Sequence, residues 1–121
     1  MSLHVSDVKP FIPAKNFQVY LNYYKELGFA TKFERDDIAE LEIGDYRFFL
    51  QNYYVKAWAN NSMLFINVSD AFAWYEHISK VVDNMVFKPA RVKPPEEQNY
   101  GDLVTFAWDP AGVLLHFAEN Q

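Results

Sequence analysis

Apolar residues recur at helical spacing in two stretches of the chain. Before the first, Asn16 is a suitable N-cap, and Gly28 is a natural stop at its end. The dipeptide Ser69-Asp70 precedes the second stretch in the same way. The apolar positions are Phe17, Tyr20, Leu21, Tyr24 and Leu27 in the first stretch, and Ala71, Trp74, Tyr75, Ile78 and Val81 in the second. This pattern predicts two amphipathic helices.

Apolar runs bounded by turn residues predict the strands. The run over residues 5–14 contains Pro10 and Pro13. Proline cannot donate to a ladder, so this strand must lie at a sheet edge or bend there. Residues 56–62 form a polar connector, and residues 94–97 form a loop. The remaining predicted strands are 30–35, 38–43, 46–53, 63–68, 86–92, 103–108 and 113–118.

The second half of the chain repeats the plan of the first. At an offset of 54 residues, Phe11 superimposes on Phe65, Asn16 on Asp70 and Leu27 on Val81. We therefore expect one domain over residues 1–121, with an internal repeat of residues 1–58 and 62–121. The order of helices and strands predicts an α+β fold with a mixed or antiparallel sheet.

Composition excludes several classes of function. The chain has no cysteine, so it has neither a disulfide framework nor a cysteine metal site. No apolar run reaches the length of a membrane span, and no signal peptide is recognisable, so a cytoplasmic protein without membrane partners is expected. A net charge of −5 argues against a nucleic-acid partner. Eight Tyr, eleven Phe and three Trp exceed the need of a small core, which suggests an aromatic groove or interface.

Several short motifs in order carry a family resemblance. Asp109-Pro110-Ala111-Gly112 predicts a type I turn inside a C-terminal hairpin that continues to His116-Phe117. The stretches 9–16, 23–29, 34–39, 61–68 and 100–101 contribute further motifs. Together they resemble the vicinal-oxygen-chelate superfamily, which includes glyoxalase I, extradiol dioxygenases and bleomycin-resistance proteins. The match is closest to the bleomycin-resistance branch, and it implies paired βαβββ modules.

The metal-dependent enzymes of that superfamily place His or Glu at four equivalent strand positions. Here the first position is Lys9, its counterpart in the second half is Met63, and the last is His116. The remaining position falls within residues 46–51, which contain neither His nor a carboxylate. One imidazole does not make a transition-metal site, so we expect no metal and no other cofactor.

In bleomycin-resistance proteins the drug is sequestered, without chemistry, in aromatic clefts of a dimer. The resemblance therefore implies a homodimer with an exchanged N-terminal strand and a small-molecule ligand. The residues at its groove-wall positions are Ile38, Phe49, Gln51, Phe65 and Tyr100. This chain departs from the family at Ile38, where an aromatic is expected, and at Phe65 and Tyr100, where Trp is common.

Two further sets of residues have alternative interpretations. His116 either lines the cavity or is a strand residue hydrogen-bonded to a neighbour. Asp36 and Asp37 either attract a cationic ligand or are solvated turn charges. We expect non-catalytic binding of a small amphipathic, cationic or aromatic molecule, as in antibiotic resistance by sequestration. The alternatives are a glyoxalase-like lyase or isomerase, a dioxygenase relative, and a stress-related accessory protein with an incidental cleft.

Overall fold

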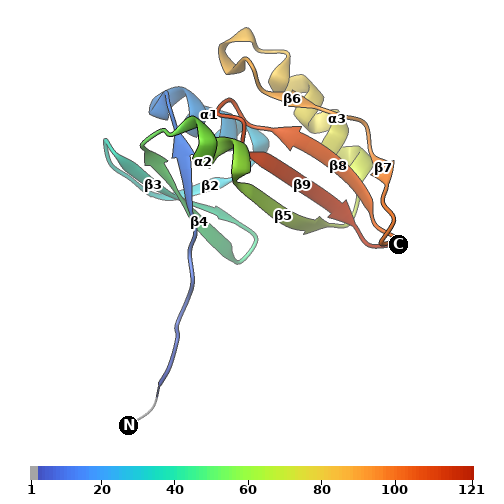
Figure 1. The fold of residues 1–121 in the computed structure, drawn as a ribbon, viewed down its shortest axis with the longest axis horizontal. Coiled ribbons are helices and arrows are strands. Elements are labelled where there is room, and N and C mark those ends of the chain that lie inside the picture. Colours follow the sequence, from blue (N-terminus) through green and yellow to red (C-terminus); the bar gives the residue numbers. More distant parts are fainter. Residues whose placement is uncertain (1–2) are drawn as a thin grey trace.

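In the computed structural model, which describes residues 3–121, two mixed sheets lie side by side (Figure 1). The first, sheet A, has the order β1-β4-β3-β2, and the second, sheet B, has the order β5-β9-β8-β6 with β7 also paired to β8. In each sheet the first strand of the module is parallel to the last. The elements of the first module are β1 (Phe11–Ala14), α1 (Phe17–Leu27), β2 (Ala30–Glu34), β3 (Ile38–Ile43) and β4 (Tyr46–Asn52). Those after it are α2 (Lys56–Asn61), β5 (Met63–Val68), α3 (Ala71–Val82), the 3-10 helix η1 (Met85–Phe87), β6 (Arg91–Val92), β7 (Glu96–Glu97), β8 (Leu103–Trp108) and β9 (Leu114–Glu119).

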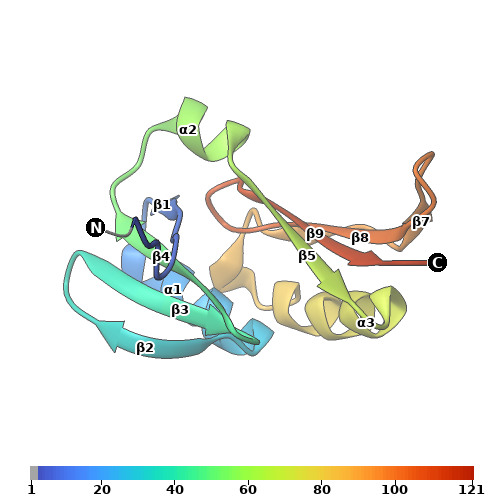
Figure 2. The same ribbon diagram turned by 90° about the horizontal axis from the view of Figure 1, so that it is seen from below.

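Both predicted helices and their caps are confirmed. The Asn16 side chain accepts a hydrogen bond from the Val19 amide, and the Asp70 side chain accepts one from the Ala73 amide. Gly28 ends α1 in the left-handed conformation that glycine tolerates best. The helix α1 packs on β4, and α3 packs on β8 and β9, so each sheet has one covered face (Figure 2). We call the opposite face of each sheet its outer face. The predicted α+β fold with paired βαβββ modules is therefore confirmed.

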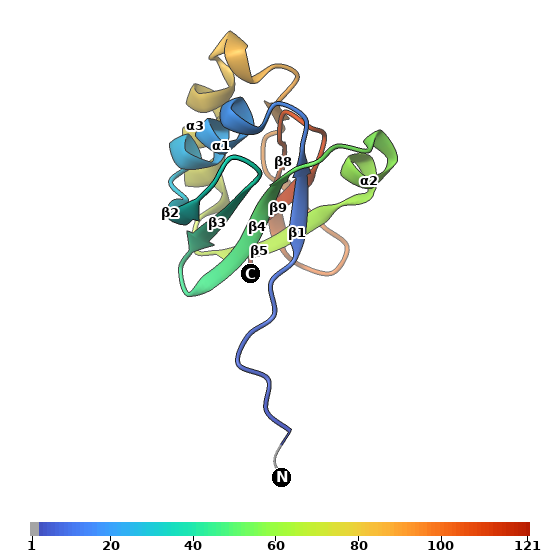
Figure 3. The ribbon, with the colours of Figure 1, turned by 90° about the vertical axis from the view of Figure 1, so that its left-hand side faces the viewer.

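Four local predictions are wrong. The N-terminal strand is limited to Phe11–Ala14; residues 7–10 contact β3 and β4 without forming a strand, and the chain before them extends away from the body (Figure 3). The predicted connector 56–62 contains helix α2, which forms because Ala59 is buried against the core although Val55 gives no side-chain cap. Residues 86–92 form a 3-10 turn and the two-residue strand β6 rather than one strand, and Glu96–Glu97 is a short strand. For α2, tertiary contacts override weak local preferences.

A buried hydrogen bond joins the two modules. The Tyr24 hydroxyl of α1 donates to the Asp109 carboxylate in the β8–β9 turn, over 2.6 Å. That carboxylate also accepts from the amides of Ala111 and Val113, at 2.8 and 2.9 Å. Burial is the largest influence on the carboxyl and raises the pKa of Asp109 to about 6, although these hydrogen bonds oppose the shift. Asp109 is therefore a core residue as well as a turn residue.

Candidate functional site

The outer face of sheet A carries a cluster of aromatic rings. Phe49 on β4 stacks on Phe11 of β1 with ring centroids 5.0 Å apart, and it lies 6.1 Å from Phe33 of β2. Side chains alternate along a strand, so Gln51 lies on the same face as Phe49. Ile38 on β3 is the cross-strand partner of Gln51 and lies on this face too. The three predicted residues Ile38, Phe49 and Gln51 are thus neighbours on one surface.

The outer face of sheet B carries a second aromatic cluster. His116 on β9 lies opposite Phe65 of β5 and Phe106 of β8. The imidazole centroid is 5.6 Å from the Phe65 ring and 5.0 Å from the Phe106 ring. Further along β8, Trp108 shares this face and lies under the Arg91 guanidinium, 3.7 Å from the ring centroid. Phe65 is 51% exposed, so it is a surface aromatic rather than a core residue.

His116 is the polar centre of this second cluster. Both ring nitrogens are shielded from solvent, and neither has a hydrogen-bond partner among the described residues. Burial lowers the pKa of His116 and so favours the neutral imidazole. The alternative that this side chain is hydrogen-bonded to a neighbour is therefore wrong. A buried polar group without a partner is rare in native proteins and requires an explanation.

The predicted residues do not form one continuous set. Tyr100 is 57% exposed in the turn before β8 (Leu103–Trp108), six residues before the Phe106 that pairs with His116. Asp36 and Asp37 are exposed in the β2–β3 turn, and the backbone carbonyl of Asp37 accepts from the Asn52 amide at 2.8 Å. The structure thus places the predicted residues on two sheet faces and in two separate turns.

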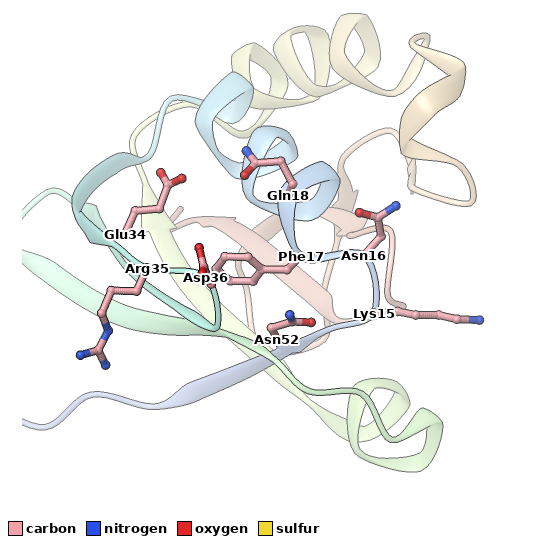
Figure 4. Close-up of a pocket in the computed structure, with 8 residues that line it drawn as sticks. All are labelled: Lys15, Asn16, Phe17, Gln18, Glu34, Arg35, Asp36 and Asn52. Carbon is pink, nitrogen blue, oxygen red and sulfur yellow. The ribbon is translucent and has the colours of Figure 1, made fainter.

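Three hollows lie near these surfaces. One of about 700 Å³ lies at the start of α1. Most of the side chains that line it are charged or polar, and Asp36 is one of them (Figure 4). The other two, of about 290 and 680 Å³, adjoin each other because both are lined by Tyr46 and Phe65. These two form a groove between β4 and β5, with Val8 of the N-terminal segment at one end and Trp74 of α3 at the other.

Sequence reasoning missed several residues of these surfaces. Phe33 and Phe106 share their faces with predicted residues, but no predicted residue lies on β2 or β8, and β2 is irregular between Thr31 and Phe33, so strand alternation alone does not identify them. Phe11 lies at the offset of 54 from Phe65 and could have been found from the repeat. Tyr46 and Trp74 gave no such signal, because they meet only through the packing of one module on the other.

The donor set at the superfamily's metal positions does not fit a metal ion. Phe11 pairs with Phe49 just as Phe65 pairs with His116, so Phe49 is the equivalent of His116 in the first module. Lys9 lies over the Phe49 ring, at 5.6 Å from its centroid. With Lys9, Phe49 and Met63 at three of the positions, His116 is the one nitrogen or oxygen donor left. Within residues 3–121, no group of three or more His, Asp or Glu side chains converges.

Comparison with known proteins extends the sequence resemblance to the whole fold. No family model and no curated protein matches the chain. Among solved structures, a bleomycin-binding protein complexed with bleomycin has a TM-score of 0.77 at 22% identity, over 97% of this chain and 100% of the other. The bleomycin-binding protein from Streptomyces verticillus, complexed with copper(II)-bleomycin, has a TM-score of 0.79 at 22% identity, over 99% and 100%. A glyoxalase-related enzyme from Fulvimarina pelagi has a TM-score of 0.73 at 16% identity, over 96% and 89%. The chain therefore has the fold shared by bleomycin-binding proteins and glyoxalase-related enzymes.

Proposed function

We propose that this protein binds and sequesters a small amphipathic molecule with an aromatic group, without catalysing a reaction. The observation that carries the proposal is the half-buried imidazole of His116, which lies between Phe65 and Phe106 and has no hydrogen-bond partner within residues 3–121. An aromatic ligand on this face would stack on the rings, and its polar group would provide the partner that the imidazole lacks. Ligand sites typically combine an apolar surface with a few polar groups in this way.

The fold is consistent with the proposal. Two solved structures of similar fold are complexes with bleomycin, at 22% identity. An enzyme that depends on a metal at the superfamily's positions is not supported, because the side chains at those positions do not supply enough donors. No helix in the described part of the chain is long and apolar enough to cross a membrane. A cytoplasmic location and a role in antibiotic resistance stay predictions.

The proposal predicts a saturable change in tryptophan fluorescence when bleomycin is added. Trp108 lies on the outer face of sheet B, and Trp74 lines the groove that contains Phe65. A ligand on either surface changes the environment of an indole ring. A panel of neutral and cationic aromatic metabolites, titrated in the same way, would define the chemical class of the ligand. A flat response to bleomycin and to the whole panel would contradict the proposed function.

We also propose that the binding groove is completed in a homodimer with an exchanged N-terminal segment. The chain before residue 7 extends from the body (Figure 3). Phe11 and Phe65, on the outer faces of the two sheets, are exposed, and a second copy would cover part of these faces. We expect light scattering at micromolar concentration to give twice the chain mass of 14.2 kDa. Deleting residues 1–8 should weaken the dimer. A stable monomer of the full chain would refute this arrangement.

A further inference from the structure

One carboxylate, that of Glu40, is buried on the outer face of sheet A. Only 7% of the residue is exposed, and it lies on β3 opposite Phe49. Its Oε2 atom is 3.5 Å from Lys9 Nζ and 3.4 Å from Arg47 Nη1. A buried carboxylate requires cationic or hydrogen-bonding partners to remain charged. The cations next to Glu40 are therefore part of what makes this surface stable.

These two cations are held in different ways. Arg47 belongs to β4, and its guanidinium is shared among Glu40, Glu42 at 3.9 Å and Asp7 at 4.0 Å. Lys9 belongs to the segment before β1. Its ammonium lies next to the Glu40 carboxylate and also 5.6 Å from the centroid of the Phe49 ring. A carboxylate and an aromatic face together are the surroundings that proteins commonly provide for a bound ammonium ion.

Lys9 can leave this position without breaking the sheet. The hydrogen bond from the Phe49 amide to the Pro10 carbonyl, at 2.9 Å, ties the segment to β4. Among the described residues before Pro10, no backbone hydrogen bond reaches the rest of the chain. Ion pairs of Asp7 and Lys9 hold this part, and the Asp7 side chain is 46% exposed. The partly exposed pairs of Asp7 contribute little and open readily. The Lys9–Glu40 pair is more buried, but Arg47 stays next to the Glu40 carboxylate when Lys9 leaves.

We propose that Glu40 and the Phe49 ring form an ammonium-binding subsite, and that Lys9 is its tethered occupant, which the ammonium group of a ligand displaces. This inference rests on the proposed function, because the subsite lies on an aromatic face assigned to ligand binding. It adds a specificity: the ligand carries an alkylammonium or quaternary ammonium group next to an aromatic ring. Lys9 also regulates binding, because the apparent affinity for the ligand is lowered in proportion to the time that Lys9 occupies the subsite.

The test compares 2-phenylethylammonium with the neutral 2-phenylethanol, each titrated against isotope-labelled protein while backbone amide shifts are recorded. In the Lys9→Gln variant the ammonium probe should bind roughly five- to tenfold more tightly than in the wild type. The alcohol should bind equally well to both. Adding Glu40→Gln to Lys9→Gln should abolish the gain, because the carboxylate that attracts the probe is then absent.

A matched control is Lys15→Gln. Lys15 also lies over an aromatic ring, 5.7 Å from the centroid of Tyr54, but it forms no ion pair with a described carboxylate. This variant should leave the affinity for the ammonium probe at the wild-type value. The spectra of all variants also show whether each is folded.

The subsite is overturned if Lys9→Gln does not tighten binding of the ammonium probe, or if the alcohol gains equally. It is also overturned if the gain survives in the double variant. These results differ from failure of the proposed function, which appears as absence of binding of bleomycin and of the metabolite panel to the wild type. If bleomycin binds while Lys9→Gln brings no gain, the subsite alone is wrong.

Discussion

Replacing Asp109 with Ala is expected to lower the free energy of unfolding by roughly 3 kcal/mol. The carboxylate is fully buried and accepts hydrogen bonds from the Tyr24 hydroxyl and from the amides of Ala111 and Val113. Without it, three buried donors lose their partner, at roughly 1–3 kcal/mol each. Removing a buried charge offsets part of that loss. Chemical denaturation of both proteins at pH 7 measures the difference.

The same residue should make stability depend on pH. The pKa of Asp109 is raised by burial from 3.8 to about 6, so the folded state binds a proton more tightly than the unfolded state. The stabilisation is therefore fully present below pH 3.8 and is lost as pH rises through about 6. A shift of about two units corresponds to about 3 kcal/mol. Asp109→Asn keeps a side-chain oxygen for the two amides but cannot titrate.

The difference in stability between wild type and Asp109→Asn isolates this effect from the other acids. We expect the wild type to gain stability relative to Asp109→Asn as the pH falls from 7 to 4. Tyr24→Phe is a useful companion, because it removes the hydroxyl donor and keeps the ring in the core. If the difference between wild type and Asp109→Asn is constant across this range, Asp109 does not titrate as a buried group.

Replacing Phe49 and Phe65 together with Ala is expected to weaken binding of bleomycin, or of a better ligand from the panel, by roughly 2–6 kcal/mol. Each ring is an exposed or half-exposed aromatic on the outer face of its sheet, and removing one such anchor typically costs about 1–3 kcal/mol. The two residues lie on different sheets, so their effects should add if the ligand contacts both faces. Isothermal titration calorimetry of the single and double variants measures the loss of binding free energy for each ring and shows whether the two losses add.

A matched control is Phe72→Ala, because Phe72 is a similarly exposed phenylalanine on α3, the helix that covers the face of sheet B opposite its outer face. It should leave the affinity unchanged. Tyr100→Ala tests whether the turn before β8 contributes to the same site. If the Phe49 and Phe65 single variants each bind as the wild type does, the ligand lies elsewhere.

Most of the fold could be predicted from the sequence, because the signals that define it are local. Asn16 and Asp70 begin helices that end near the expected positions, and the repeat offset matches β1 to β5. Helix α2 escaped prediction because its one buried residue, Ala59, is held by tertiary packing rather than by a periodic apolar face. Strands β6 and β7 have two residues each, which is too short for an alternating pattern to appear.

The sequence pointed to some residues of the candidate site, but not to the contacts that these residues make. The family resemblance alone pointed to Phe49, Phe65 and His116 without the structure. It gave no sign that Asp109 is buried or that Glu40 holds Lys9, because both contacts join residues far apart in the sequence. An Asp before Pro-Ala-Gly is already explained by the turn that it begins. Nothing further in the sequence indicates that Asp109 is also a buried core residue.

The central claim is that the aromatic outer faces of the two sheets hold the ligand, and a titration of isotope-labelled protein with bleomycin tests it most directly. We expect saturable shifts of backbone amides in β4, β5 and β9, centred on Phe49, Phe65 and His116. Shifts confined to the hollow at the start of α1, around Lys15, Gln18 and Asp36 (Figure 4), would contradict it. So would a spectrum that bleomycin leaves unchanged.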